Sequence, residues 1–265
     1  MSISTIAKTS LSRLARTLGY EIVSVSRVMP RDIASHLRSV FETLDITCVL
    51  DVGANVGQYR TLLRDEVGYE KLIVSFEPAR HAVQALRDQS RTDARWVIYP
   101  CALGARNDVR SLNVMRADTL SSFLAPDNSV TDLFAGHNSV DHTEAVDVRT
   151  LDSVMDELRT GRDIGTGIFL KMDTQGYDLQ VLAGAQQSLA GIAAVQTELS
   201  CLSLYKEMPS YVSVLSVLDA KGFQLSGMFP VNQDSALRVI EADCVMINGA
   251  RVAGKPLRLM WTNAP

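Results

Sequence analysis

The chain has 265 residues, of which 46% are hydrophobic and 21% charged, an ordinary globular composition with room for one large domain and an extension. Its formal net charge of −4 and isoelectric point of about 5.6 argue against a nucleic-acid-binding protein, because such proteins usually carry a basic stripe. No apolar run approaches the roughly 18 residues of a membrane span or resembles a signal peptide, so we expect a soluble protein with at most peripheral membrane contact.

The four cysteines are far apart and form no CxxC pair, which argues against a zinc site of that type. Cys48, Cys101 and Cys244 lie in or beside apolar runs, where cysteine usually behaves as a small buried hydrophobe. This usage fits a reducing compartment, and we expect a cytoplasmic protein.

Residues 1–45 are predicted to form an N-terminal helical extension, followed by the main domain at 46–265. Apolar residues recur at helical spacing between Ile6 and Leu18, and Pro30 opens a second helix that runs to Leu44. These helices would cap the main domain or form the contact of a homodimer.

From Thr47 onward, short apolar runs alternate with helical patterns, as in a parallel sheet covered on both faces. Strands are predicted at Cys48–Val52, Leu72–Phe76, Trp96–Tyr99, Gly167–Met172 and Ala193–Glu198. Helices are predicted at Val56–Glu66, Arg80–Gln89, Tyr177–Ser188 and Ser210–Lys221. Two late strands, near Phe223–Gly227 and Asp243–Ile247, would be joined by a hairpin-like connection. The predicted fold is α/β and Rossmann-like, a mostly parallel seven-stranded sheet with an antiparallel terminal strand, in the version typical of methyltransferases.

Residues 105–150 interrupt this alternation and are predicted to be an insertion or lid. Asn107-Asp108 is a candidate hairpin turn, with strands at Val109–Val114 and Ala145–Val148. The polar segment from Ala117 to Thr143 is long for a loop in a compact domain, and such loops are usually functional or mobile. We interpret it as a lid that binds the acceptor.

The most informative motif is Gly53-Ala54-Asn55-Val56-Gly57, a glycine turn between a strand that carries Asp51 and a helix. Glycine lets a ligand approach the backbone closely. The P-loop pattern is absent, and the dinucleotide pattern GxGxxG lacks a glycine, while Asp51 would repel a pyrophosphate. S-adenosylmethionine has no phosphate and carries an ammonium group that an acid suits. The turn therefore favours this cofactor, with NAD as the weaker alternative.

Acidic residues lie at the ends of four predicted strands, namely Asp51, Glu77, Asp173 and Glu198. Functional groups of open α/β sheets gather at this edge, where Glu77 would accept hydrogen bonds from a ribose diol. Asp173 and Glu198 together would offer hard oxygen ligands to Mg²⁺. Helix capping would explain one such acid, but four are harder to explain in this way.

At these residues the chain resembles the FkbM-type methyltransferases, over roughly residues 47 to 250. The resemblance rests on five segments, Asp51–Gly57, Phe76–Pro78, Ala102–Gly104, Thr150–Asp152 and Lys171–Ala185. It implies a class I methyltransferase that uses S-adenosylmethionine to methylate a hydroxyl group, commonly of a sugar in a natural product, glycolipid or polysaccharide. A methyltransferase for another small O or N acceptor, or a non-catalytic partner that kept the fold, are the alternatives.

The resemblance also implies roles by position. Asp51, Gly53 and Asn55 would contact the methionine end of the cofactor, Glu77 the ribose, and Ala102 the surroundings of the adenine. Gly57 and Pro78 complete the predicted cofactor-binding set.

A sugar hydroxyl needs a general base, a metal ion or both before it can attack. The candidate bases are Asp173, His142 and His137. Histidine has the more suitable intrinsic pKa, whereas Asp173 has the better predicted position, between cofactor and acceptor. The predicted metal ligands are Asp173 and Glu198. The predicted partner is a small-molecule or lipid-linked sugar.

Overall fold

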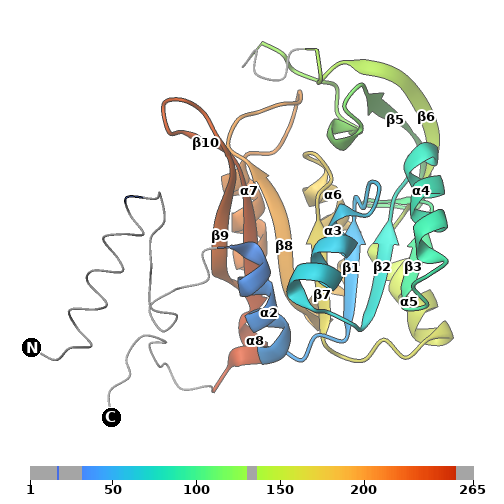
Figure 1. Ribbon diagram of the computed structural model, residues 1–265, viewed down its shortest axis with the longest axis vertical. Helices are drawn as coiled ribbons and strands as arrows, with labels where there is room; N and C mark the ends of the chain where they lie inside the picture. The colour runs from blue at the N-terminus through green and yellow to red at the C-terminus, as the bar shows by residue number, and fades with distance from the viewer. Residues whose placement is uncertain (1–16, 18–31, 130–135, 255–265) are drawn as a thin grey trace, which may run out of the picture. The chain divides into compact units, whose positions relative to one another are not determined.

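The structure, a computed structural model, describes residues 17, 32–129 and 136–254 (Figure 1). Residues Asp32–Ala253 form one compact unit. The helix predicted between Ile6 and Leu18 lies outside the described residues, apart from Thr17. Among the residues described, no helix has both the length and the apolar character needed to cross a membrane.

A seven-stranded sheet forms the centre of this unit (Figure 1). Its strands are β1 (Cys48–Val52), β2 (Leu72–Phe76), β3 (Trp96–Tyr99), β7 (Ile168–Met172), β8 (Ile192–Ser200), β9 (Phe223–Gln233) and β10 (Val239–Asn248). They follow the order β3-β2-β1-β7-β8-β10-β9, with β10 antiparallel to both of its neighbours and inserted between them. The predicted α/β fold with a mostly parallel sheet and an antiparallel terminal strand is confirmed.

Helices cover both faces of this sheet, so its central strands are buried throughout. Every residue of β1 and β7 is buried, as expected for nearly continuous apolar strands between two helical layers. One core contains the apolar sides of α5 (Leu151–Gly161), α6 (Asp178–Ala183) and α7 (Tyr211–Ala220). The other contains those of α2 (Ile33–Thr43), α3 (Gln58–Thr61) and α4 (Arg80–Ser90).

The remaining helical segments are short. They are the π-helix η2 (Leu62–Val67), the 3₁₀ helices η3 (Asp118–Leu120) and η4 (Leu189–Gly191), and the helix α8 (Gly249–Val252).

Two predicted helices differ from those observed. The helix predicted at Val56–Glu66 begins as α3 and widens into η2, a form of helix that often occurs near functional sites. The helix predicted at Tyr177–Ser188 ends at Ala183 in the structure. A Cβ atom on the next residue, Gly184, would lie 2.0 Å from the carbonyl oxygen of Gly104, so the chain packs backbone against backbone here.

A second, smaller sheet has the order β4-β6-β5, and two of its three strands lie within the predicted insertion. Its strands are β4 (Ala102–Leu103), β5 (Asp108–Met115) and β6 (Val140–Arg149). The strands predicted at Val109–Val114 and Ala145–Val148 are present and pair antiparallel. The predicted hairpin turn at Asn107-Asp108 is wrong, because β5 pairs with the distant β6. The Asn107 side chain instead accepts a hydrogen bond from the Thr150 amide (2.8 Å), which ties the start of β5 to α5.

Candidate active site

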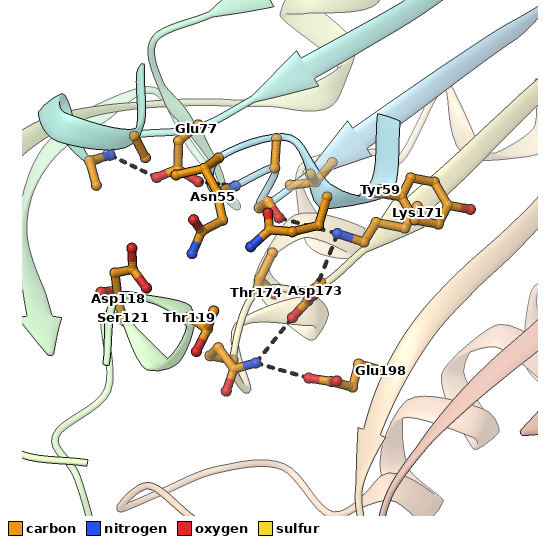
Figure 2. Close-up of a pocket in the computed structure, with 18 of the residues that line it drawn as sticks. Asn55, Tyr59, Glu77, Asp118, Thr119, Ser121, Lys171, Asp173, Thr174 and Glu198 are labelled. Atoms are coloured by element: carbon orange, nitrogen blue, oxygen red, sulfur yellow. Dashed lines mark hydrogen bonds and ion pairs between the residues drawn. The ribbon is translucent and has the colours of Figure 1, made fainter. Parts of the chain in front are cut away.

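A cavity of about 690 Å³ opens beside the carboxyl ends of β1, β2 and β7 (Figure 2). It gathers most of the predicted site residues in its lining, namely Gly53, Asn55, Gly57, Glu77, Pro78, Ala102, Asp173 and Glu198. Asp118, Thr119 and Ser121 of the predicted lid segment line it as well, and the His81 ring lies 3.5 Å from the Asp118 carboxylate. Asp51 and His142 are not among the lining residues.

The glycine turn has left-handed backbone at three positions, with φ of 76° at Gly53, 46° at Asn55 and 95° at Gly57. A Cβ atom on Gly53 would lie 1.9 Å from the carbonyl oxygen of Asp173, so only glycine fits there. Asn55 adopts a conformation that non-glycine residues seldom take, and asparagine is among the residues that tolerate it best. Its side-chain oxygen is buried and has no hydrogen-bond partner among the described residues. Asn55 also lines the cavity.

Glu77 holds the turn in place from the end of β2. One carboxylate oxygen accepts a hydrogen bond from the backbone amide of Asn55 (2.8 Å), and the other accepts one from the backbone amide of Ala79 (2.8 Å) (Figure 2). Burial raises the pKa of Glu77 to about 7, although both amides act in the opposite direction. The acid predicted to bind the ribose therefore also fixes the backbone that surrounds the cofactor site.

Asp51 is fully buried, and it pairs with Lys171, which lines the cavity. Its carboxylate lies 3.1 Å from the Lys171 ammonium and accepts a hydrogen bond from the Ser75 hydroxyl (3.0 Å). The Ser75 hydroxyl in turn accepts from the indole nitrogen of Trp96 (2.9 Å), so a polar chain crosses three neighbouring strands. The direct contact predicted between Asp51 and the cofactor ammonium stays a prediction.

Lys171 is a buried cation between two carboxylates. Its ammonium lies 3.5 Å from the Asp173 carboxylate, donates to the Gly53 carbonyl (3.1 Å) and lies 5.2 Å from the Tyr59 ring centroid. Burial alone would lower the pKa of Lys171, but the charges of Asp51 and Asp173 outweigh it and raise that pKa above its ordinary value. A lysine inside an otherwise apolar strand was the sequence signal for this role, since a buried charge requires a partner.

Asp173 and Glu198 are linked through the side chain of Gln175. The Gln175 amide nitrogen donates to Asp173 (3.0 Å) and to Glu198 (2.9 Å). The Asp173 side chain is 35% exposed and lines the cavity, so a ligand can reach it. Burial, together with the negative charges of Asp173 and two acids of β10, raises the pKa of Glu198 to about 9.

The predicted magnesium site falls on this same pair. Among the described residues, no group of three or more histidine, cysteine or acidic side chains is arranged to hold a metal. Mg²⁺ often uses only one or two carboxylates, with water and substrate completing its coordination. Here, however, the Gln175 amide bridges Asp173 and Glu198, and the Lys171 ammonium lies beside Asp173. The pair would fit the ion only after the amide moved, and Mg²⁺ stays a prediction.

The two candidate histidines lie away from the cavity lining. His142 is an exposed residue of β6, and its ring nitrogens lie 2.9 Å from the Asp141 carboxylate and 3.2 Å from that of Glu144. These hydrogen bonds raise the pKa of His142. His137 is exposed in the connection that precedes β6. Neither histidine lines the cavity, so their positions do not support the predicted role of general base. Asp173 does line the cavity, and its position supports that role.

Comparison with known proteins gives a family match. The profile of the methyltransferase FkbM domain matches residues 51–225. No curated protein sequence matches the chain.

Among solved structures, a methyltransferase FkbM from Methylobacillus flagellatus KT is similar, with 17% identity, a TM-score of 0.48, and coverage of 76% of this chain and 44% of that one. The present chain therefore spans less than half the length of that protein. Aeropyrum pernix fibrillarin, solved with bound S-adenosylmethionine, has 11% identity and a TM-score of 0.43 over 76% of this chain and 66% of its own. An rRNA methylase from Streptococcus thermophilus has 9% identity and a TM-score of 0.44 over 83% and 99%.

Proposed function

The chain belongs to the FkbM family of S-adenosylmethionine-dependent methyltransferases, and from this premise we propose that it methylates a hydroxyl oxygen of a sugar. The sugar would be part of a glycolipid, a polysaccharide or a natural product. The observation that carries the proposal is a single cavity lined both by the Gly53–Gly57 turn with Glu77 and by the reachable carboxylate of Asp173. One half suits the methyl donor, and the other suits a hydroxyl group that must lose its proton.

The donor half would hold the cofactor with the predicted residues. Glu77 would accept hydrogen bonds from the ribose hydroxyls, in the position that an acid after the second strand takes in nucleotide-binding sheets. The unpartnered side-chain oxygen of Asn55 would accept from the ammonium of the methionine end. Pro78 and Ala102 would lie beside the adenine. When bound, the cofactor supplies a methyl group already activated by its sulfonium charge.

The acceptor half would deprotonate and aim the hydroxyl group. Transfer of the methyl group from the sulfonium sulfur to the acceptor oxygen would leave S-adenosylhomocysteine, and Asp173 would act as the base that receives the hydroxyl proton. The Lys171 ammonium lies 3.5 Å from Asp173 and is one of the groups that hold this base in place. Holding the oxygen in line with the methyl carbon would supply several kcal/mol of the rate acceleration.

An acceptor screen tests this function. Purified protein is supplied with S-adenosylmethionine and either a panel of methyl and lipid-linked glycosides or a matched panel of primary amines, and S-adenosylhomocysteine release is measured. We expect release with a glycoside and none with the amines. Release with amines alone would overturn the hydroxyl assignment. Calorimetric binding of NAD, with no binding of S-adenosylhomocysteine, would overturn the cofactor.

A further inference from the structure

Gln175 occupies an unusual backbone position at the edge of the cavity. It lies in the turn after β7 with a φ of 50°, in the left-handed region that glycine and asparagine tolerate far better than glutamine. Residues in such conformations persist where surrounding contacts hold them, and they cluster at active sites.

Each polar side-chain atom of Gln175 has a partner, and its backbone carbonyl has one too. The amide nitrogen donates to Asp173 and Glu198, the amide oxygen lies 3.0 Å from the Tyr205 hydroxyl, and the carbonyl accepts from the Ser122 hydroxyl (2.8 Å). One residue thus joins the end of β7, the end of β8 and the segment that carries Ser122. Such a network is well suited to fixing the position of a carboxylate.

Tyr205 contacts the Gln175 amide. It is completely buried, and its hydroxyl lies 2.7 Å from the carbonyl oxygen of Leu120 as well as beside the Gln175 amide oxygen. In the observed orientation the Gln175 amide nitrogen donates to the carboxyl groups of both Asp173 and Glu198.

We propose that Gln175 is a positioning residue that orients the Asp173 carboxylate toward the acceptor, and that Tyr205 acts through it. Lys171 holds one oxygen of Asp173 and Gln175 holds the other, so the carboxylate is held at both ends and cannot rotate freely. Gln175 also separates Asp173 from Glu198. This inference rests on the proposed function, in which Asp173 receives the acceptor proton.

The test compares four variants using S-adenosylhomocysteine release, with the methyl glycoside that turns over fastest in the screen. Gln175→Met keeps the length of the side chain and removes its hydrogen bonds. It should lower kcat at least about tenfold, because a misplaced catalytic group costs rate rather than affinity. The glycoside KM and the calorimetric Kd for S-adenosylhomocysteine should stay within about twofold of the wild type.

Tyr205→Phe should lower kcat by about threefold, and the double variant should be no slower than Gln175→Met alone, since coupled residues are not additive. Gln180→Met, an exposed glutamine of α6 outside the cavity lining, is the matched control and should behave as the wild type.

The outcomes separate this inference from the function on which it rests. A wild type without turnover on any glycoside overturns the proposed function and, with it, the role of Gln175. A turning-over wild type with an unchanged kcat in Gln175→Met overturns the positioning role alone. Equal losses in kcat and cofactor affinity would also overturn it, because they would make Gln175 a structural part of the cofactor pocket. If the losses of kcat in the two single variants add in the double variant, Tyr205 does not act through Gln175.

Discussion

The Glu77→Gln variant should bind S-adenosylhomocysteine at least about tenfold more weakly than the wild type. In the structure each Glu77 oxygen accepts one backbone hydrogen bond of 2.8 Å, from Asn55 or Ala79. A glutamine has only one accepting oxygen, so its NH₂ group would face one of these amides. The ribose would also lose a charged acceptor, and losing one hydrogen bond to a charged group costs about 1.5 kcal/mol or more, which corresponds to the tenfold change.

The assay is titration calorimetry at pH 8, above the raised pKa of Glu77 of about 7, so that the wild-type group is ionised. Glu70→Gln is the matched control, because Glu70 is 74% exposed and pairs with Arg95 on the surface. It should leave the Kd unchanged. A Glu77→Gln protein that is folded and binds within about twofold of the wild type would refute the assignment of Glu77 to the cofactor.

Four further outcomes are expected. Asp173→Asn should lower turnover by about a hundredfold or more in the methyl-transfer assay while leaving the Kd for S-adenosylhomocysteine nearly unchanged, and an equal loss in His142→Ala with no loss in Asp173→Asn would transfer the role of base to His142. EDTA should slow turnover and added Mg²⁺ should restore it if the predicted metal is used, whereas an unchanged rate removes the metal from the mechanism. Gly53→Ala should lower the urea-derived free energy of unfolding by at least about 1 kcal/mol more than Gly68→Ala. Both glycines have positive φ, but a new methyl group would lie 1.9 Å from a carbonyl oxygen at position 53 and would meet nothing within 4 Å at position 68, so equal losses would contradict the steric argument. Folded Glu77 keeps a proton that the unfolded chain releases near its ordinary pKa of 4.5, so the free energy of unfolding should fall as the pH rises from 4.5 to about 7, and Glu77→Gln should lack this part of the fall.

The parts of the fold that the sequence predicted well depend on local pattern. The apolar runs at Cys48–Val52 and Leu72–Phe76 coincide with β1 and β2 because each is bounded by polar or turn-forming residues. The late hairpin was predicted too short, since β9 extends to Gln233 through residues that are mostly exposed and show no clear alternation. The helix α5 was not predicted, although it begins directly after the span interpreted as a lid, which ends at residue 150.

The candidate site was predicted in its composition but not in its connections. The residues that line the cavity follow from strand ends and glycine turns, which are visible in one short segment at a time. The contact of Asp51 with Lys171 and the bridge from Gln175 to Glu198 and Tyr205 join residues 23 to 120 positions apart. Such pairings depend on strand order and register, which a single sequence does not specify. The sequence motif therefore showed the buried Lys171 and the neighbouring Gln175 without indicating a role for either.

The polar chain that ends at Trp96 gives the protein a natural optical probe. Trp96 is one of two tryptophans in the sequence, its indole is 4% exposed, and its ring packs where a side chain on Gly57 would otherwise lie. In a Trp261→Phe background Trp96 would be the sole source of indole fluorescence, and its ring lies next to Gly57 of the glycine turn. Ligand entry and release would then be measurable in real time by stopped flow, with no dye attached.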